Sequence, residues 1–145
     1  MNEKEVCLIA KIPIRSSKKE IEDFLIELRE ILDVKHFDIN RNFLLIRSHR
    51  SHGEHHYSTS QTLIDLDYAQ EDVVARLREL SVSEYYETLL DSDDEHPPYL
   101  FVFAKNINSR QVYIKIKIKE GYAQKVLCVS FHFAQYEMID FPYAR

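Results

Sequence analysis

Two stretches near the C-terminal end combine residue types that can act on a phosphodiester. Residues 112–119 alternate strictly between apolar and polar side chains, which is typical of a strand with one buried face. Its apolar face would carry Val112, Ile114, Ile116 and Ile118, and its polar face Tyr113, Lys115, Lys117 and Lys119. In the next stretch, KVLCVSFHF, the same alternation places Leu127, Val129 and Phe131 on one face, and Cys128, Ser130 and His132 on the other.

If these two strands form an antiparallel hairpin around residues 120–124, their apolar faces must coincide to build a core. Ser130 and His132 then lie on the same face as Tyr113. A loop of four to six residues allows Tyr113 to pair with either Ser130 or His132, and directly opposed side chains have Cβ atoms roughly 5 Å apart.

Such a face would suit cleavage of RNA without a metal ion. His132, with an ordinary pKa of about 6.5, can give or take a proton near neutral pH. Tyr113 can donate a hydrogen bond to a phosphate oxygen or orient the 2′-hydroxyl. Lys115 can neutralise the charge of a phosphorane-like transition state, as can Lys105, which lies at the end of the preceding strand and is expected to join this face.

We therefore expect His132, Tyr113, Lys115 and Lys105 to be catalytic, and Ser130 and Lys117 to bind substrate. The same residue types are also typical of the solvent-facing side of an ordinary sheet. The pattern alone does not decide between these two interpretations.

The elements that position these residues are helices first and strands last. Ser17 and Glu20 form the signature of a capping box, and apolar residues at helical spacing predict a helix over residues 18–33. Residues 71–80 and the segment SEYYETLL also show helical patterns, the latter starting at Ser81 or Ser83 and ended by Pro97 and Pro98.

Strand-like runs surround these helices. Residues 5–13 predict a short strand or arm ended by Pro13, and HFDI and FLLIR predict a hairpin joined by residues 40–42. Residues 48–60 predict a loop, and residues 61–67 a short turn or helical piece whose Asp67 could cap the next helix. After Pro98, YLFVFAK, QVYIKIKIK and KVLCVSFHF predict a three-stranded meander. The fold class is α+β, with N-terminal helices packed on one face of an antiparallel sheet.

Composition and charge limit the functions that we expect. The formal net charge is −5, which argues against a general nucleic-acid binder. Residues 96–145, however, hold seven Lys or Arg against three acidic residues, whereas the first 95 hold 12 basic and 21 acidic residues. A basic end could bind phosphate at one face, although acidic helices and a Lys-bearing strand could also simply be solvated.

The chain shows no signal peptide and no run of the ~18 apolar residues that a membrane span requires. Cys7 and Cys128 lie in strand-like runs and are read as reduced core residues. These features favour a cytoplasmic protein without a membrane partner.

Four segments of residues 57–133 share a pattern with one known family: QVYIKIKI, VLCVSFH, LSVSEYYETL and YSTSQTLIDLDYAQEDV. In order and spacing they resemble the motility quorum-sensing regulator (MqsR) toxins. The resemblance implies one RelE-like domain over residues 1–145, with a strand, helix and hairpin added in residues 1–50 and an aromatic tail in 134–145. It also implies an mRNA endoribonuclease neutralised by a cognate antitoxin, without a small-molecule cofactor.

Carried over by residue, the resemblance makes Tyr113 the family's catalytic strand tyrosine. His132 stands where the family has a Lys, Glu87 where it has a helical Lys, and Leu100 at about the place of a Gln. These departures put the rate, and activity itself, in doubt. The alternatives are a non-catalytic interaction module with a RelE-like fold, and a partner-binding domain of unrelated fold.

Three other features carry less chemistry. The loop with His49, His52, His55 and His56 lacks the spacing of an established zinc site, so no metal is expected. The acidic run 91–95 is typical of a solvated helix end and lacks the features of a Ca²⁺ loop. The aromatic tail could stack on bases or pack back across the sheet.

Overall fold

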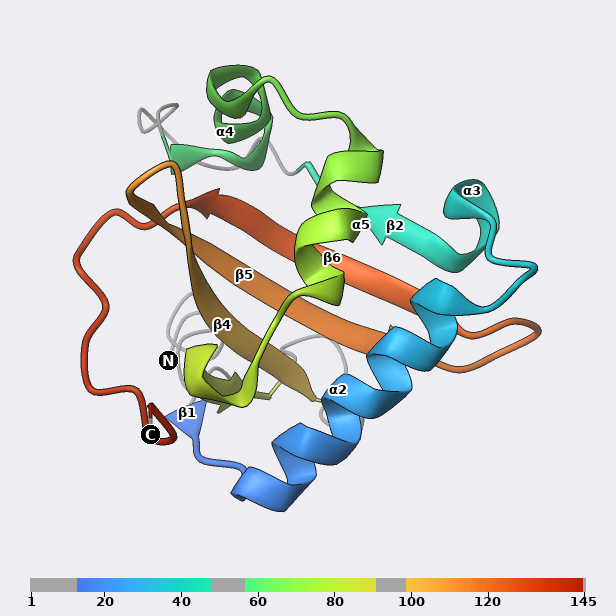
Figure 1. Ribbon diagram of the computed structural model, residues 1–145, viewed down its shortest axis with the longest axis horizontal. Helices are drawn as coiled ribbons and strands as arrows, with labels where there is room; N and C mark the ends of the chain where they lie inside the picture. The colour runs from blue at the N-terminus through green and yellow to red at the C-terminus, as the bar shows by residue number, and fades with distance from the viewer. Residues whose placement is uncertain (1–12, 48–56, 91–98, 145) are drawn as a thin grey trace, which may run out of the picture.

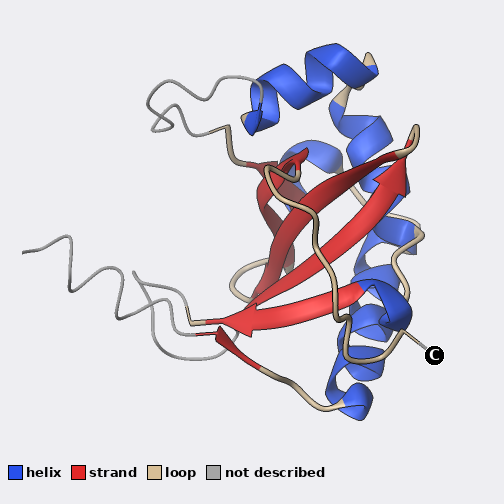
Figure 2. Ribbon diagram, turned by 90° about the vertical axis from the view of Figure 1, so that its left-hand side faces the viewer, coloured by secondary structure: helices blue, strands red, loops and turns tan. Residues whose placement is uncertain are grey.

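The computed structural model describes residues 13–47, 57–90 and 99–144. It contains a six-stranded sheet in the order β1-β3-β4-β5-β6-β2, with helices gathered on one side (Figures 1 and 2). The strands are β1 (Pro13–Ile14), β2 (Phe43–Leu45), β3 (Tyr85–Leu89), β4 (Leu100–Ile107), β5 (Arg110–Lys119) and β6 (Lys125–Phe133). The helices are α2 (Lys18–Asp33), α3 (Ile39–Asn42), α4 (Thr59–Leu66) and α5 (Gln70–Arg78), with a 3₁₀ turn at Val82–Glu84. The predicted α+β class, with helices on one face of a mostly antiparallel sheet, is confirmed.

Helix α2 has the bounds and the cap that its sequence predicts. The Ser17 hydroxyl accepts from Glu20 N at 3.1 Å, and the Glu20 carboxylate accepts from Ser17 N at 2.9 Å, so each satisfies an amide that the helix leaves unpaired. The pKa of Glu20 is lowered by these hydrogen bonds from Ser17. The buried stripe of α2 packs with α5 against the sheet and is formed by Ile21, Phe24, Leu25, Leu28, Ile31 and Leu32.

The C-terminal meander and its pairing are confirmed. Strands β4, β5 and β6 pair antiparallel in sequence order, and Tyr113 lies opposite His132, with Lys115 opposite Ser130. One side of β5 meets the helices through Val112, Ile114, Ile116 and Ile118, all of which are buried. The opposite side, which we call the open face, carries Tyr113 and Lys115 and is covered by none of the helices described (Figure 2).

A β-bulge in β6 corrects the predicted alternation of that strand. Lys115 pairs with Ser130 but Ile116 pairs with Cys128, so Val129 is the extra residue. The bulge turns the side chain of Cys128, which is fully buried, toward the core on the helix-covered side. It places Val129 on the open face, where Val129 packs against the small cluster of Leu89, Leu100 and Val102. The prediction that Cys128 shares a face with Ser130 and His132 is therefore wrong. The expectation of a reduced, buried thiol at Cys128 holds, and burial raises the pKa of that thiol. Cys7 lies outside the described residues.

The hairpin predicted around residues 40–42 does not form. Asp38 caps the single turn of α3 through Asn40 N at 2.8 Å, and the Asn42 side chain accepts from Asp38 N at 2.9 Å. These short polar side chains bond the local backbone in a helical turn, which competes with a hairpin. The following strand β2 then runs parallel to β6, with Phe43 opposite Val126.

The helix predicted for SEYYETLL is also wrong, because most of this segment is strand β3. The Ser81–Glu84 cap closes only one 3₁₀ turn. Beyond it, the chain pairs antiparallel with β4, and the Tyr85 hydroxyl lies 2.6 Å from Thr88 Oγ1 in the buried interior. Sheet pairing and burial outweigh the local helical signal here.

The segments between β2 and β3 agree in part with prediction. Residues 48–56 of the expected loop lie outside the described residues. Helix α4 begins at Thr59, so the last two residues of the loop predicted over residues 48–60 are helical. Asp67 ends α4 in a left-handed conformation, with φ of 57°, rather than capping the next helix. Helix α5 follows from Gln70, close to the expected start.

Both sheet edges beyond the meander are closed by short elements. Pro13 lies within β1, opposite Leu89, and β1 continues to Ile14, so Pro13 does not end the strand. Residues 5–12 of that prediction lie outside the described residues. On the other edge, hydroxyls of α4 accept from backbone amides of β6: Thr59 from Phe131 at 3.2 Å and Thr62 from Phe133 at 3.0 Å. These bonds satisfy amides that β2 is too short to reach.

The C-terminal tail packs back onto the molecule, which agrees with the second of the two predictions made for it, packing across the sheet. Both oxygen and nitrogen of the Gln111 side-chain amide bond the backbone of Met138, at 2.8 and 2.9 Å. Phe141 packs edge-on against Tyr86, and the Tyr143 hydroxyl donates to Ser16 O at 2.6 Å. The tail thus returns from β6 to the N-terminal end of α2, near β1 (Figure 1).

Candidate functional site

The open face brings Tyr113 and His132 into contact. They are directly opposed on β5 and β6, and their rings stack with centroids 5.1 Å apart and planes inclined by 15°. On the other side of β5, the buried Ala104 of β4 lies opposite Tyr113. An imidazole and a phenol are therefore held in contact on adjacent strands.

The surroundings of His132 favour a neutral imidazole with a defined tautomer. Its Nδ1 lies 2.9 Å from the carbonyl oxygen of Phe133, which can only accept, so Nδ1 carries the proton and Nε2 the lone pair. Burial lowers the pKa of His132, and the positive charge of Lys115 lowers it further, while the hydrogen bond to Phe133 opposes both. Nε2 is thus the atom that can accept a proton.

Tyr113 is held in the opposite protonation state. Burial raises its pKa to about 12, and the nearby Glu87 and Tyr86 contribute to the increase. The phenol keeps its proton near neutral pH and is a hydrogen-bond donor rather than a base.

A second row of side chains crosses the open face beside this pair. In register, Glu87 on β3 lies opposite Val102 on β4, Val102 opposite Lys115 on β5, and Lys115 opposite Ser130 on β6. Burial raises the pKa of the Glu87 carboxyl, whereas the charge of Lys115 lowers it. Lys115 therefore lies between an acidic group and an imidazole, and its charge acts on both.

A hollow of about 290 Å³ adjoins the stacked rings. Its lining comes from β3, β5, β6 and the tail, and consists of Tyr86, Tyr113, His132, Ala134, Gln135, Tyr136, Glu137 and Met138. Tyr136 is mostly exposed at its rim. The hollow thus offers a proton acceptor, a donor and aromatic walls to a molecule bound from solvent.

A sequence model described as motility quorum-sensing regulator, toxin of MqsA, matches residues 44–133, which is well over half of the chain. The chain belongs to this family of toxins. No curated protein and no solved structure matches it, so the RelE-like architecture implied by the resemblance stays a prediction.

The family match begins within β2 and ends with β6. It therefore contains both strands that carry Tyr113 and His132, and excludes α2 and the tail that walls the hollow. The family core supplies the stacked pair, and the flanking segments complete its surroundings.

One predicted site residue, Lys105, is not on the open face. It lies opposite Val112, and opposed residues of an antiparallel pair point to the same side, so its side chain belongs to the helix-covered side. There its Nζ lies 3.3 Å from Glu84 Oε2 and 3.8 Å from Glu79 Oε1, with 14% of the side chain exposed. The expectation that Lys105 joins Tyr113 is wrong, because a pair of acids holds it on the other face.

Lys117 does share the open face, but it is only 5% exposed. It lies opposite Leu127, two residues from Lys115 along β5. Its ammonium contributes charge to this face from a nearly buried position. Lys115, Ser130 and His132 are half-buried and therefore more accessible.

Two residues near the stacked pair were not predicted to belong to the site. The sequence placed Glu87 on a predicted helix, at a position where the family has a Lys, and gave Tyr86 no role. In the structure both residues lie on β3, and both raise the pKa of Tyr113. The aromatic and β-branched residues of YYETL were the available signal for a strand. That strand assignment would have brought Glu87 to the open face.

Neither a metal centre nor a membrane span is found in the part of the chain that the structure describes. Within residues 13–47, 57–90 and 99–144, no group of three or more His, Cys, Asp or Glu could hold an ion. The loop with His49, His52, His55 and His56 lies outside those ranges, as does the acidic run 91–95. None of the described helices is long and apolar enough to cross a bilayer.

Proposed function

We propose that this toxin-family protein is an endoribonuclease that cleaves mRNA by attack of a 2′-hydroxyl on the adjacent phosphorus. The observation that carries the proposal is the stacked Tyr113–His132 pair beside Lys115, at a hollow open to solvent. An unprotonated Nε2, a protonated phenol and an ammonium are the three functions that this reaction needs.

In the proposed reaction His132 Nε2 takes the proton of the 2′-hydroxyl as its oxygen bonds to phosphorus. Tyr113 donates a hydrogen bond to a phosphate oxygen or orients the attacking hydroxyl. Lys115 stabilises the additional negative charge of the phosphorane, and Ser130 binds the substrate. The bond to the 5′-oxygen breaks, this oxygen takes a proton from water, and a 2′,3′-cyclic phosphate remains.

We also propose that a cognate antitoxin neutralises the protein, as the family description pairs its toxins with one. The proposed setting is the cytoplasm, where mRNA and an antitoxin are both present. Gene neighbourhood offers an inexpensive test, because an adjacent gene for a small helix-turn-helix protein would supply the candidate partner.

Purified wild-type protein and a His132→Ala variant, incubated with single-stranded RNA, test the enzymatic proposal. Loss of the base is expected to reduce the cleavage rate by about 10²–10⁴-fold. The matched control is His36→Ala, which removes an exposed histidine outside the hollow. Cyclic phosphate ends on the products would support the route, whereas equal, negligible cleavage by wild type and His132→Ala would reject it.

The second candidate is a non-catalytic interaction module, and Glu87 is the observation that favours it. A carboxylate beside Lys115 opposes the approach of a phosphate, where the resemblance places a lysine in other members. A Glu87→Lys variant separates the two functions. If the protein is an enzyme, cleavage should become faster with the acid replaced, and if it is not, no RNA product should form with either residue.

A further inference from the structure

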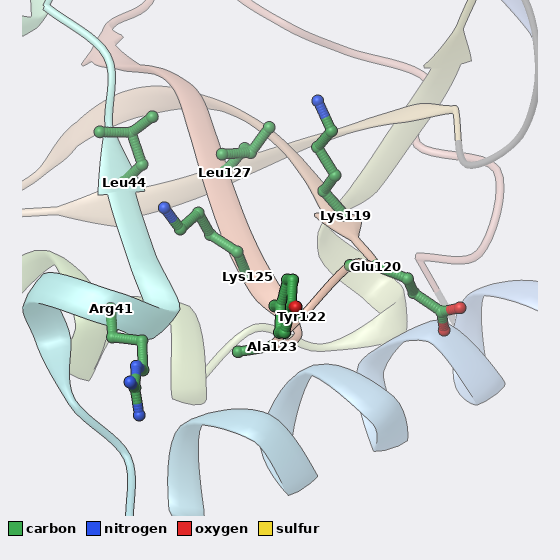
Figure 3. A pocket seen from close by; sticks show the side chains of 9 residues that line it. Arg41, Leu44, Lys119, Glu120, Tyr122, Ala123, Lys125 and Leu127 are labelled. Carbon is green, nitrogen blue, oxygen red and sulfur yellow. The ribbon is translucent and has the colours of Figure 1, made fainter.

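A second hollow, of about 520 Å³, lies at the turn between β5 and β6 (Figure 3). Its walls come from α3, β2, the two strands and their turn, and consist of Arg41, Leu44, Lys119, Glu120, Gly121, Tyr122, Ala123, Lys125 and Leu127. None of these residues has a role in the reaction proposed above. We call this the hairpin hollow.

Positive charge dominates the hairpin hollow. Its lining contains three basic residues, Arg41, Lys119 and Lys125, and one acidic residue, Glu120. The Glu120 carboxylate points away from the two lysine ammonium groups in Figure 3. Within the described ranges, none of the three cations forms an ion pair, although the surrounding chain is acidic overall. Unpaired cations gathered around a hollow favour an anionic ligand with more than one charge.

An exposed aromatic ring stands among these cations. Tyr122 is fully exposed, and its side chain lies between Lys125 and Glu120 in Figure 3. The turn that carries it is fixed from both sides: Asn42 Nδ2 donates to Gln124 O at 3.0 Å, and Gln124 Nε2 lies 3.4 Å from Glu27 Oε1. A tethered turn therefore presents a phenol ring to solvent, where a base can stack on it.

The hairpin hollow opens on the same face as the stacked pair. Lys119 follows Tyr113 by six residues on β5 and shares its side of the sheet, and it lies opposite Lys125. At about 3.4 Å per residue the two sites are roughly 20 Å apart along the strand. That separation matches about six stacked nucleotides and fewer in an extended strand.

We propose that the hairpin hollow binds single-stranded RNA upstream or downstream of the cleaved bond. Arg41, Lys119 and Lys125 contact successive phosphates, and a base stacks on Tyr122. This combination of backbone cations and an aromatic platform is how proteins hold single strands without reading their sequence. The inference rests on the proposed function, since it assigns a further subsite to the same substrate.

Binding of a 12-nucleotide RNA with 2′-O-methyl sugars tests this inference, because that RNA cannot undergo 2′-hydroxyl attack. Fluorescence anisotropy at several salt concentrations gives Kd and its salt dependence. The triple variant Arg41→Gln, Lys119→Gln, Lys125→Gln should lower the slope of log Kd against log salt by about two, at roughly 0.7 per lost phosphate contact. Tyr122→Ala should weaken binding about fivefold or more, and Tyr122→Phe should not.

The charge-matched control is Arg15→Gln, Lys18→Gln, Lys19→Gln, which removes three exposed cations at the start of α2. It should leave Kd and slope near the wild-type values. Thermal unfolding checks that both triple variants are folded. Cleavage of an ordinary 12-mer by the hairpin variant should show a raised KM with little change in kcat.

The outcomes separate this inference from the proposed cleavage. Binding that depends on Tyr122 and the three cations, in a protein that cleaves nothing, supports the hairpin hollow and rejects the enzyme. Cleavage by a triple variant that binds the 12-mer with wild-type affinity and slope rejects the hairpin hollow alone. Absence of any RNA binding by the wild type also rejects the RNA-binding role of the hairpin hollow. Its cations would then be candidates for contact with an acidic protein partner.

Discussion

At the scale of single residues, the protein places two titratable rings face to face and biases them in opposite senses. Burial raises the pKa of Tyr113 to about 12 and lowers that of His132, so each ring is held in its neutral form. A neutral imidazole accepts a proton and a neutral phenol donates one. At about pH 6.5, where an unperturbed histidine is half protonated, His132 is therefore mostly unprotonated and Tyr113 keeps its proton.

The lowered pKa of His132 predicts the pH dependence of cleavage. Protonated imidazole cannot act as a base, so kcat/KM should fall as the pH drops through a midpoint below 6.5 and should be constant above it. Replacing Lys115 by Gln removes one cause of the lowered pKa, and the midpoint should move up. Lys18→Gln, an exposed residue on α2, is the control. A wild-type midpoint above 6.5 would contradict the assignment of His132 as the base.

At the scale of elements, β3 shows how tertiary pairing selects a conformation. Its Tyr85 hydroxyl accepts from Ser16 N at 2.9 Å and lies 2.6 Å from Thr88 Oγ1, which in turn lies 2.7 Å from Ser16 Oγ. All three residues are buried. This network joins β3 to the chain between β1 and α2, and a helix at the same residues could not form it.

Removal of the Tyr85 hydroxyl should therefore destabilise the fold. In Tyr85→Phe, the buried Ser16 amide and the Thr88 hydroxyl both lose a partner, and the free energy of unfolding should decrease by about 1–3 kcal/mol. Urea denaturation followed by circular dichroism measures the change. Tyr122→Phe removes a fully exposed hydroxyl and should have no measurable effect. Equal stability of Tyr85→Phe and wild type would show that the network contributes little.

At the scale of the whole molecule, the sheet separates a structural face from a chemical one. The helices cover one side, and the C-terminal tail borders the other, next to the stacked pair (Figure 2). Gln111 fixes the tail to the end of β5 by bonding Met138 as a neighbouring strand would. The tail thus shapes the wall of the hollow without belonging to the family core.

Loss of the Gln111 amide should loosen the tail while the sheet stays folded. Gln111→Ala removes two hydrogen bonds, worth about 1–3 kcal/mol together, which corresponds to roughly 5- to 150-fold more frequent local opening. Limited digestion with chymotrypsin, which can cut after Tyr136 or Tyr143, reports that opening as a faster cleavage rate. Gln135→Ala, at an exposed tail position, should digest like wild type. Unchanged digestion of Gln111→Ala would show that the aromatic contacts hold the tail unaided.

Where one face of an element is buried and the other is not, the sequence alone determined the structure. The strict alternation of β5 set its faces, and the capping box at Ser17 set the start of α2, because both signals are local. The same logic limited the partner of Tyr113 to Ser130 or His132, and the structure selects His132. This local information thus predicted that Tyr113 and His132 share one face of the sheet, whereas the stacking of their rings is known only from the structure.

Only the tertiary structure decided features whose energy lies in distant contacts. The residues before Lys105 are apolar on both faces of the strand, so the sequence did not show to which face Lys105 points. The pairing with Val112 places Lys105 on the helix-covered side, where it forms ion pairs with Glu79 and Glu84. The bulge at Val129 moved Cys128 into the core without a local signal. Strand β3 took its conformation from pairing with β4, which outweighs helical propensity because a whole ladder of hydrogen bonds and a buried network depend on it.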